Sequence, residues 1–273
     1  MTWLDDYFAR IDYSGPVRPD RATLFALHQA HLAAIPYENL EIQLGRENVL
    51  AESAFIDKLV RRRRGGWCYE MNGLLTTALR EIGFNVTRVA GAVARDLLAD
   101  EAVGNHLIRL VDLERRYVAD VGLGDGPLEP VPLEARAWSE GSLAFRLERF
   151  DTDWWRFHNH EHGLARTFDF TEEPRALEWY QGMCTRLQTE DFSPFMNYAF
   201  VFRRSVRGVD ALRDDSYVRV MDGVRSERQI GSREDYAQVL KQMFGNDLGA
   251  EVDTLWAKVE VRARKRAESA AQP

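Results

Sequence analysis

The first part of the chain carries apolar residues at the spacing of an α-helix. Between Arg21 and Ile35, four residues fall near one face at helical spacing: Phe25, Gln29, Leu32 and Ile35. Pro36 follows directly and ends the segment. A second, shorter helix is predicted over Phe55 to Arg63.

The strongest helical pattern in the chain follows the glycine pair Gly65-Gly66. Its apolar positions obey the i, i+3, i+4 rule and are Met71, Leu75, Ala78, Leu79 and Ile82. Gly83 stands where a C-terminal cap is expected. The pattern therefore predicts a helix that begins near Cys68 and ends at Gly83.

After Phe84 the apolar period changes from about 3.6 towards two, which favours short strands. The predicted strands are Val86 to Ala94, His106 to Leu113, Tyr117 to Val121, Leu143 to Phe150, Trp154 to Asn159 and Leu164 to Phe170. Beyond Phe192 the pattern is mixed, with strands over Tyr198 to Arg203 and Tyr217 to Met221 and a helix from Arg233. The order of helical, β and mixed regions predicts the α+β fold class, and the charged tail Arg262 to Pro273 is expected to be frayed.

Composition narrows the function classes. The chain has 273 residues, 45% of them hydrophobic and 29% charged, and a net charge of −7. We expect no nucleic-acid partner, because binding to phosphate backbones requires an excess of Lys and Arg. We also expect a soluble, cytoplasmic protein with no membrane partner, because the sequence shows no long apolar run and no export signal. The run Arg61 to Arg64 is the local exception, and is either a solvated helix end or a site near an anionic ligand.

One of the two cysteines lies in a setting that suits a nucleophile. Cys68 follows Gly65-Gly66 and opens the strongest helix, so unpaired backbone N–H groups and the positive end of the helix dipole point towards its sulfur. Such positions lower the pKa of a thiol, and we expect Cys68 to favour the thiolate. Cys184 has no comparable setting and is expected to be an ordinary packed or surface thiol.

A thiol nucleophile needs a base, and His106 is the best placed of the six histidines. It opens an apolar strand directly after a polar loop. Asp120 lies within the next apolar strand, where a charged carboxylate needs a partner. An imidazole opposite Asp120 would have its tautomer fixed, which predicts a Cys68, His106, Asp120 triad.

Three further histidines offer a rival interpretation. His158, His160 and His162 alternate, so an extended strand would place all three on one face as a candidate metal site. A hairpin turn over Asn159 to Gly163 would splay the rings, and no cysteine lies near to complete a zinc set. We therefore predict no metal, with a non-catalytic metal-binding protein as the alternative.

At this point the sequence resembles a known family. The segment Arg64-Gly65-Gly66-Trp67-Cys68-Tyr69-Glu70-Met71-Asn72-Gly73 is similar to the active-cysteine signature of the arylamine N-acetyltransferases. Two further segments resemble motifs of that family, Ile35-Pro36-Tyr37-Glu38-Asn39-Leu40 and Asp120-Val121-Gly122-Leu123-Gly124. The resemblance is strong over roughly residues 20 to 135 and weaker beyond, where Ser193-Pro194-Phe195 is a partial match.

The resemblance implies a fold and an activity. The implied architecture has a cysteine-protease-like catalytic core, with a helical domain (1–84) carrying the cysteine, a β-barrel domain (85–192) carrying the histidine and aspartate, and an α/β lid (193–273). The implied reaction moves an acetyl group from acetyl-CoA to an aromatic amine or hydrazine by a ping-pong mechanism, through a thioester on Cys68. Departures at four apolar positions, Tyr37, Trp67, Tyr69 and Leu123, bear on acceptor choice more than on chemistry.

Contacts to the acetyl donor, acetyl-CoA, are harder to predict. A backbone N–H near Val103 to Gly104, together with that of Cys68, is a candidate donor to the tetrahedral oxyanion. Gly124 and Gly126 belong to a spaced glycine loop that is either a plain turn or a close approach to CoA. The same triad also serves amide synthases and other thiol-dependent acyl transferases or hydrolases, which stay open as alternatives.

Overall fold

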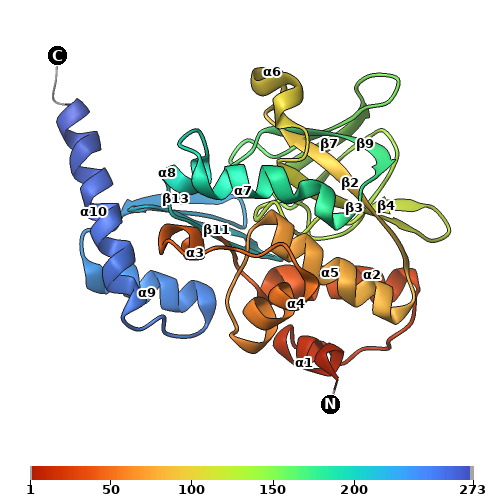
Figure 1. Cartoon of the computed structure of the whole chain (residues 1–273), viewed down its shortest axis with the longest axis horizontal. Helices are drawn as coiled ribbons and strands as arrows, with labels where there is room; N and C mark the ends of the chain where they lie inside the picture. The colour runs from red at the N-terminus through yellow and green to blue at the C-terminus, as the bar shows by residue number, and fades with distance from the viewer. Residues whose placement is uncertain (1, 271–273) are drawn as a thin grey trace.

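Helix α5 (Cys68–Ile82) occupies the centre of the computed structural model, which describes residues 2–270. It ends at Gly83, whose φ of +103° places it in the left-handed region that glycine adopts without strain. The helix packs against α2 and α4 on one side and against strands β2 and β3 on the other (Figure 1). Both ends of the predicted helix are therefore confirmed.

The remaining helical elements of the N-terminal region surround α5. They are α1 (Trp3–Arg10), α2 (Arg21–Ala34), α3 (Leu40–Gln43), α4 (Glu52–Phe55) and the π-helix η1 (Ile56–Arg61). The helix predicted from Arg21 is confirmed as α2. The short helix predicted over Phe55 to Arg63 is split between α4 and η1.

An eight-stranded antiparallel sheet forms the middle of the molecule, in the order β5-β4-β3-β2-β9-β8-β7-β6. Its strands are β2 (Asn85–Val93), β3 (His106–Asp112), β4 (Arg116–Val118), β5 (Val131–Pro132), β6 (Arg136–Glu140), β7 (Leu143–Arg149), β8 (Trp155–His158) and β9 (Thr167–Pro174). The short helices α6 (Arg95–Leu98) and η2 (Ala99–Ala102) connect β2 to β3. The sheet curls without closing, since β5 and β6 are its two edges, so the predicted barrel is a curled open sheet.

A second sheet of five strands has the order β1-β10-β11-β12-β13. Its strands are β1 (Tyr37–Glu38), β10 (Phe200–Ser205), β11 (Gly208–Arg213), β12 (Ser216–Met221) and β13 (Val224–Gln229). Its edge strand β1 comes from the N-terminal region and pairs antiparallel with β10. This pairing joins the beginning of the chain to its last third.

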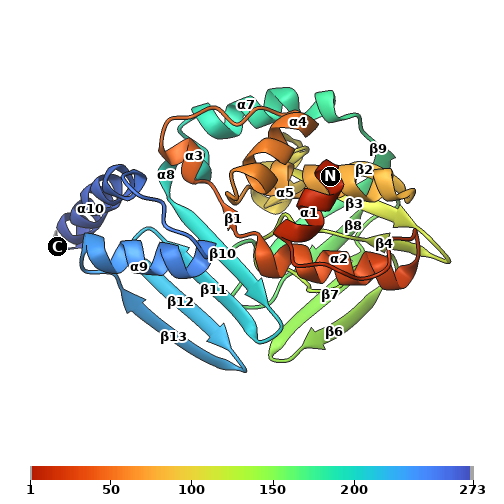
Figure 2. The same ribbon diagram turned by 90° about the horizontal axis from the view of Figure 1, so that it is seen from below.

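Helices connect and cover the second sheet. They are η3 (Leu177–Tyr180), α7 (Gln181–Thr189), α8 (Pro194–Asn197), α9 (Arg233–Phe244) and α10 (Glu251–Ala270). Helix α9 packs on the sheet and α10 packs on α9 (Figure 2). The predicted frayed tail is wrong as far as Ala270, because Arg262 pairs with the buried Asp214 at 2.6 Å and holds α10 against β11 and β12. Residues 271–273 lie outside the described part.

Two apolar clusters hold these layers together. The larger one joins the helices around α5 to the inner face of the curled sheet, and the smaller one lies between the second sheet, α9 and α10. The predicted α+β class is confirmed. Within residues 2–270, no helix is both long and apolar enough to cross a membrane.

Candidate active site

Cys68 is the first residue of α5, and the loop before it is fixed by the backbone. The N–H of Gly66 donates to Pro36 at 3.2 Å, and the N–H of Glu38 donates to Gly66 at 2.9 Å. The carboxylate of Glu70 then accepts from the N–H of Trp67 at 3.2 Å and caps the helix. The start of the nucleophile helix therefore has little freedom.

Cys68 is only 2% exposed, and this burial acts on the pKa of its thiol. Burial raises the pKa of the thiol above its ordinary value, while the backbone N–H groups of Leu107 and Tyr69 act in the opposite direction. Burial therefore acts against the predicted preference for thiolate.

His106 opens β3, as predicted, and faces Asp120. Its Nε2 lies 2.7 Å from Oδ2 of Asp120. Asp120 stands two residues beyond the end of β4, so its predicted place inside a strand is wrong. The chain leaves the strand ladder there, which lets the carboxylate turn towards the imidazole.

The charge on Asp120 fixes the tautomer of His106. Burial by itself raises the pKa of Asp120, but the charge and hydrogen bond of His106, with hydrogen bonds from Asn72 and Gly122, lower it to about 2. An ionised carboxylate only accepts, so Nε2 of His106 carries a proton, and in the neutral imidazole Nδ1 then keeps its lone pair. His106 can therefore receive a proton at Nδ1.

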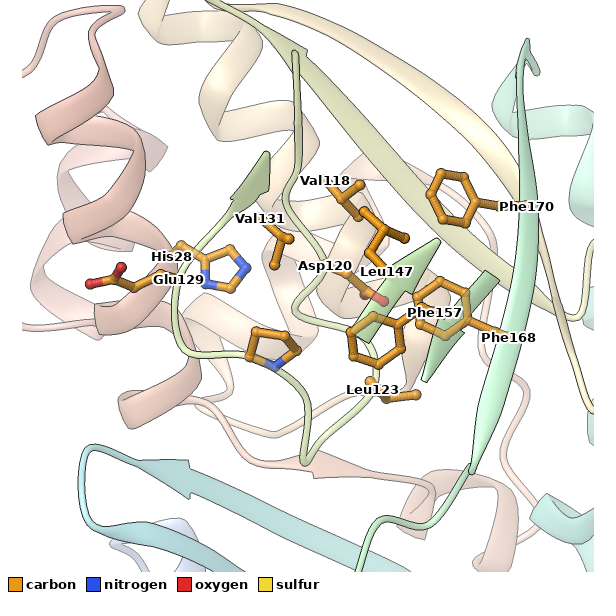
Figure 3. A pocket seen from close by; sticks show the side chains of 11 residues that line it. His28, Val118, Asp120, Leu123, Glu129, Val131, Leu147, Phe157, Phe168 and Phe170 are labelled. Carbon is orange, nitrogen blue, oxygen red and sulfur yellow. The ribbon is translucent and has the colours of Figure 1, made fainter. Parts of the chain in front are cut away.

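The carboxylate of Asp120 is largely enclosed by protein. Behind the carboxylate lies a cavity of about 20 Å³, lined by His28 on one side and by Phe157, Phe168 and Phe170 on the other (Figure 3). Most of its other lining side chains are apolar. Asp120 therefore relies on protein groups to stabilise its charge, as a buried ion must.

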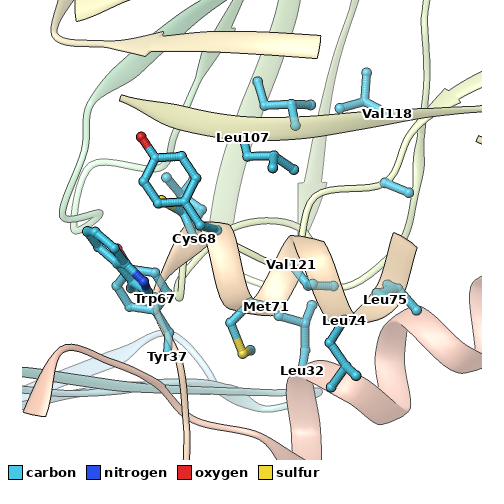
Figure 4. Packing of buried hydrophobic residues seen from close by; sticks show 14 of the residues in the cluster. Leu32, Tyr37, Trp67, Cys68, Met71, Leu74, Leu75, Leu107, Val118 and Val121 are labelled. Atoms are coloured by element: carbon cyan, nitrogen blue, oxygen red, sulfur yellow. The ribbon is translucent and has the colours of Figure 1, made fainter. Parts of the chain in front are cut away.

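Cys68 and His106 both line one pocket of about 650 Å³. Cys68 lies at the N-terminal end of α5, beside β3, the strand that begins with His106 (Figure 4). Four aromatic side chains line the same pocket: Tyr37, Phe192, Phe195 and Phe200. The structure thus brings the three predicted residues together, two on the pocket and Asp120 behind them.

Two of the four departures from the family motifs also face this pocket. Tyr37 and Leu123 line it. Trp67 and Tyr69 are buried instead, and the hydroxyl of Tyr69 donates to the carbonyl of Gly104 at 2.5 Å. Only the first two can therefore shape the pocket directly.

The residues predicted to contact acetyl-CoA lie outside the lining of this pocket, and their contact with the cofactor stays a prediction. Val103, Gly104, Gly124 and Gly126 are not among the residues that line the pocket. The N–H of Val103 donates to Asp100 at 3.1 Å, and that of Gly104 donates to Gly91 at 2.8 Å. Neither N–H is free to stabilise an oxyanion, which leaves the N–H of Cys68 from the predicted pair.

The three alternating histidines face different partners. His158 contacts Glu148 at 2.7 Å, and Nε2 of His160 contacts the backbone oxygen of Asp125 at 3.0 Å. Among residues 2–270, no group of three His, Cys, Asp or Glu side chains is arranged to hold a metal ion.

Several residues of the site were not foreseen. Phe192 and Phe200 line the pocket, although only the segment Ser193-Pro194-Phe195 between them carried a signal, as a partial family match. Asn72 donates to Asp120 of the triad, and Arg109 donates to Asn72. Asn72 belonged to the motif around Cys68, but its pattern did not indicate a contact with Asp120.

Comparison with known proteins gives a consistent result. A family model described as N-acetyltransferase matches residues 20–252. A pineal gland isozyme of arylamine N-acetyltransferase from Gallus gallus is 32% identical over 235 residues, which cover 77% of this chain and 80% of that protein.

Solved structures agree over nearly the whole chain. The arylamine N-acetyltransferase of Salmonella typhimurium has a TM-score of 0.84 at 29% identity, covering 96% of this chain and 99% of that one. The Mycobacterium marinum arylamine N-acetyltransferase in complex with CoA has a TM-score of 0.85 at 26% identity, covering 94% and 98%.

Proposed function

The chain belongs to the arylamine N-acetyltransferase family and is an acyltransferase, and on this premise we propose its reaction in detail. It transfers an acetyl group from acetyl-CoA to the nitrogen of an aromatic amine or hydrazine. The acetyl group is carried as a thioester on Cys68, so the reaction has two half-reactions with one shared base.

The observation that carries this proposal is the orientation of His106. Its Nε2 is held by Asp120 at 2.7 Å, so Nδ1 remains for a proton from the pocket that Cys68 shares. Because burial raises the pKa of Cys68, the thiol is a poor nucleophile until a base removes its proton. His106 is that base.

In the first half-reaction, Nδ1 of His106 takes the proton of the thiol as the sulfur attacks the thioester carbonyl of acetyl-CoA. A bond forms between the sulfur of Cys68 and the carbonyl carbon, and the bond to the CoA sulfur breaks. The leaving thiolate takes the proton from His106. One thioester replaces another, so the acetyl group stays activated.

In the second half-reaction, the nitrogen of the amine attacks the acetyl group on Cys68. His106 takes a proton from that nitrogen and returns it to the departing sulfur, which restores the thiol. Asp120 stabilises the imidazolium in both steps. The backbone N–H of Cys68 is the candidate donor to the oxyanion.

The pocket suits both substrates in turn. Its volume of about 650 Å³ lies within the range of sites for small organic ligands. Its aromatic lining offers stacking faces to an aromatic acceptor. The CoA complex of the Mycobacterium marinum relative supports acetyl-CoA as the donor.

The covalent step can be tested by mass spectrometry of the intact protein. With acetyl-CoA and no acceptor, the protein should gain one acetyl group, and an aromatic amine should then remove it and appear acetylated. Cys68→Ala and Cys68→Ser should gain none and keep their fold, while the matched variant Cys184→Ala, at the other buried thiol, should be acetylated as before. Product formation without any acetylated protein would contradict the thioester.

Steady-state kinetics test the order of events. Varying acetyl-CoA at several concentrations of amine should give parallel double-reciprocal lines, because the two substrates never share the site. Intersecting lines would indicate direct transfer in a ternary complex. Release of free acetate with no acetylated amine would favour a hydrolase instead.

A further inference from the structure

Asn72 makes an unusual set of contacts behind the triad. Its side chain is fully buried on α5, one turn after Cys68. Its amide nitrogen donates to Oδ1 of Asp120 at 2.7 Å and to the carbonyl of Leu107 at 2.5 Å. Its amide oxygen accepts from the N–H of Val121 at 3.0 Å and from Arg109.

These contacts join the three segments that carry the triad. Cys68 and Asn72 share one helix, Leu107 follows His106 on β3, and Val121 follows Asp120 in the loop after β4. One amide group therefore sets the position of the nucleophile helix relative to both the base and the acid.

Arg109 fixes the amide of Asn72 in turn. Its guanidinium is fully buried on β3 and donates to the side-chain oxygen of Asn72, to the backbone oxygen of Asn72 at 3.1 Å and to that of Ala119 at 2.5 Å. Guanidinium groups only donate, so the contacted oxygen must be the acceptor. The amide nitrogen of Asn72 consequently points towards Asp120 and cannot flip without leaving two donors facing each other.

The two oxygens of Asp120 are divided between different partners. Oδ1 accepts from Asn72 and from the N–H of Gly122 at 2.8 Å, and Oδ2 is left for His106. Without Asn72, Oδ1 would keep a single donor. The carboxylate could then rotate about its terminal bond, and the imidazole would lose its fixed orientation.

From this geometry we propose that Asn72 is a positioning residue for the reaction, anchored by Arg109. It holds Asp120 in the orientation that occupies Nε2 of His106 and leaves Nδ1 for the pocket that Cys68 also lines. The inference rests on the proposed function, since it assigns the triad its roles. It adds a residue that touches neither substrate.

The test is Asn72→Ala, compared with two variants on the same helix that do not reach Asp120. Thr76→Val removes a buried hydrogen bond, from the Thr76 hydroxyl to the backbone oxygen of Asn72 at 2.7 Å. Leu75→Ala removes fully buried apolar side-chain atoms and lowers stability by itself. Urea unfolding of all three gives the loss of stability against which activity is compared.

The first readout needs no substrate. Iodoacetamide should alkylate Cys68 of the wild-type protein faster than Cys184, and Asn72→Ala should slow alkylation of Cys68 about 10- to 100-fold, the effect expected for losing a hydrogen bond to a charged group. The second readout is kinetic: kcat should fall by a similar factor while KM for the amine stays within about twofold. Thr76→Val and Leu75→Ala should keep both values near those of the wild type.

The outcomes separate the two proposals. If Cys68 of the wild-type protein is no more reactive than Cys184, the triad assignment fails. If wild-type Cys68 is reactive but Asn72→Ala alkylates and turns over at the wild-type rate, the positioning role fails. It fails equally if Leu75→Ala, at the same loss of stability, loses as much activity as Asn72→Ala.

Discussion

Gly122 lies so close to Asn72 that a Cβ on Gly122 would stand 2.4 Å from the side-chain nitrogen of Asn72 and 2.9 Å from Cα of Cys68. Real Cβ atoms do not approach other atoms so closely, so any side chain at Gly122 must push α5 away from the loop that carries Asp120.

We therefore predict that Gly122→Ala lowers kcat at least about 10-fold, since displacements of about 1 Å cost enzymes large factors in rate. The matched control is Gly182→Ala in α7, where a Cβ would meet no atom within 4 Å. That variant should retain full activity and be slightly more stable, because alanine favours a helix over glycine. Equal activity of both variants would contradict the close approach.

Asp120→Asn tests the charge behind His106. The amide keeps the shape of the carboxylate but can present a donor to Nε2, which favours the wrong tautomer of the imidazole. By analogy with Ser-His-Asp enzymes, kcat should fall about 10⁴-fold. Circular dichroism should confirm an unchanged fold, and retention of more than a tenth of the activity would show that the carboxylate charge is dispensable.

Buried His28 makes stability depend on pH. Burial lowers the pKa of His28 from 6.5 to about 4, with a smaller opposing effect from the carbonyl of Leu128. The unfolded chain therefore binds a proton below about pH 6.5 that the folded protein refuses. Stability from this group is fully present above pH 6.5 and is lost as the pH falls towards 4, by about 2 kcal/mol at pH 5.

Replacing His28 with Gln removes this titration and keeps an amide that can donate to the Leu128 carbonyl. The difference in unfolding free energy between pH 7.5 and pH 5, measured with urea, should shrink by about 2 kcal/mol in His28→Gln. Other groups that titrate in this window are present in both proteins and cancel. If the difference in unfolding free energy is the same in both proteins, protonation of His28 does not cause the loss of stability.

Gln43 holds the segment Phe195 to Tyr198, in which Phe195 lines the pocket. Its Nε2 donates to the backbone oxygens of Phe195 at 2.7 Å, Met196 at 3.1 Å and Tyr198 at 3.2 Å. Gln43→Ala should leave this segment less firmly held and raise KM for the aromatic amine about 10-fold, with little change in the rate at which Cys68 is alkylated. Gln29→Ala, which removes only a surface contact with Glu129, is the control.

Much of the fold could be predicted from the sequence, because a helix or strand with one buried face has apolar residues at a regular spacing. Helix α5 and strand β3 were predicted closely, since their inward positions are apolar at helical or strand spacing. Strand β13 was missed because its residues are all exposed and show no alternation. The end of α10 was misjudged because its order comes from ion pairs of Arg262 and Arg266 with Asp214, which no local pattern reveals.

The candidate site divides in the same way. Cys68, His106 and Asp120 could be predicted because each carries a local signal, namely a helix start, a strand start and an acid among apolar residues. The burial that raises the pKa of Cys68 could not be predicted, because burial is a tertiary property. Asn72 and Arg109 are polar residues on buried faces, and their role depends on contacts between segments that are distant in sequence.

Helix α10 contacts Gln43, the residue that holds the segment Phe195 to Tyr198. Lys258 donates to the backbone oxygen of Gln43, and Arg262 donates to its side-chain oxygen at 3.0 Å. On the ribosome, Cys68, His106 and Asp120 are therefore synthesised long before the residues that brace the pocket above them. A nascent chain can assemble the triad early, but the pocket above it is completed only once α10 has left the exit tunnel and docked.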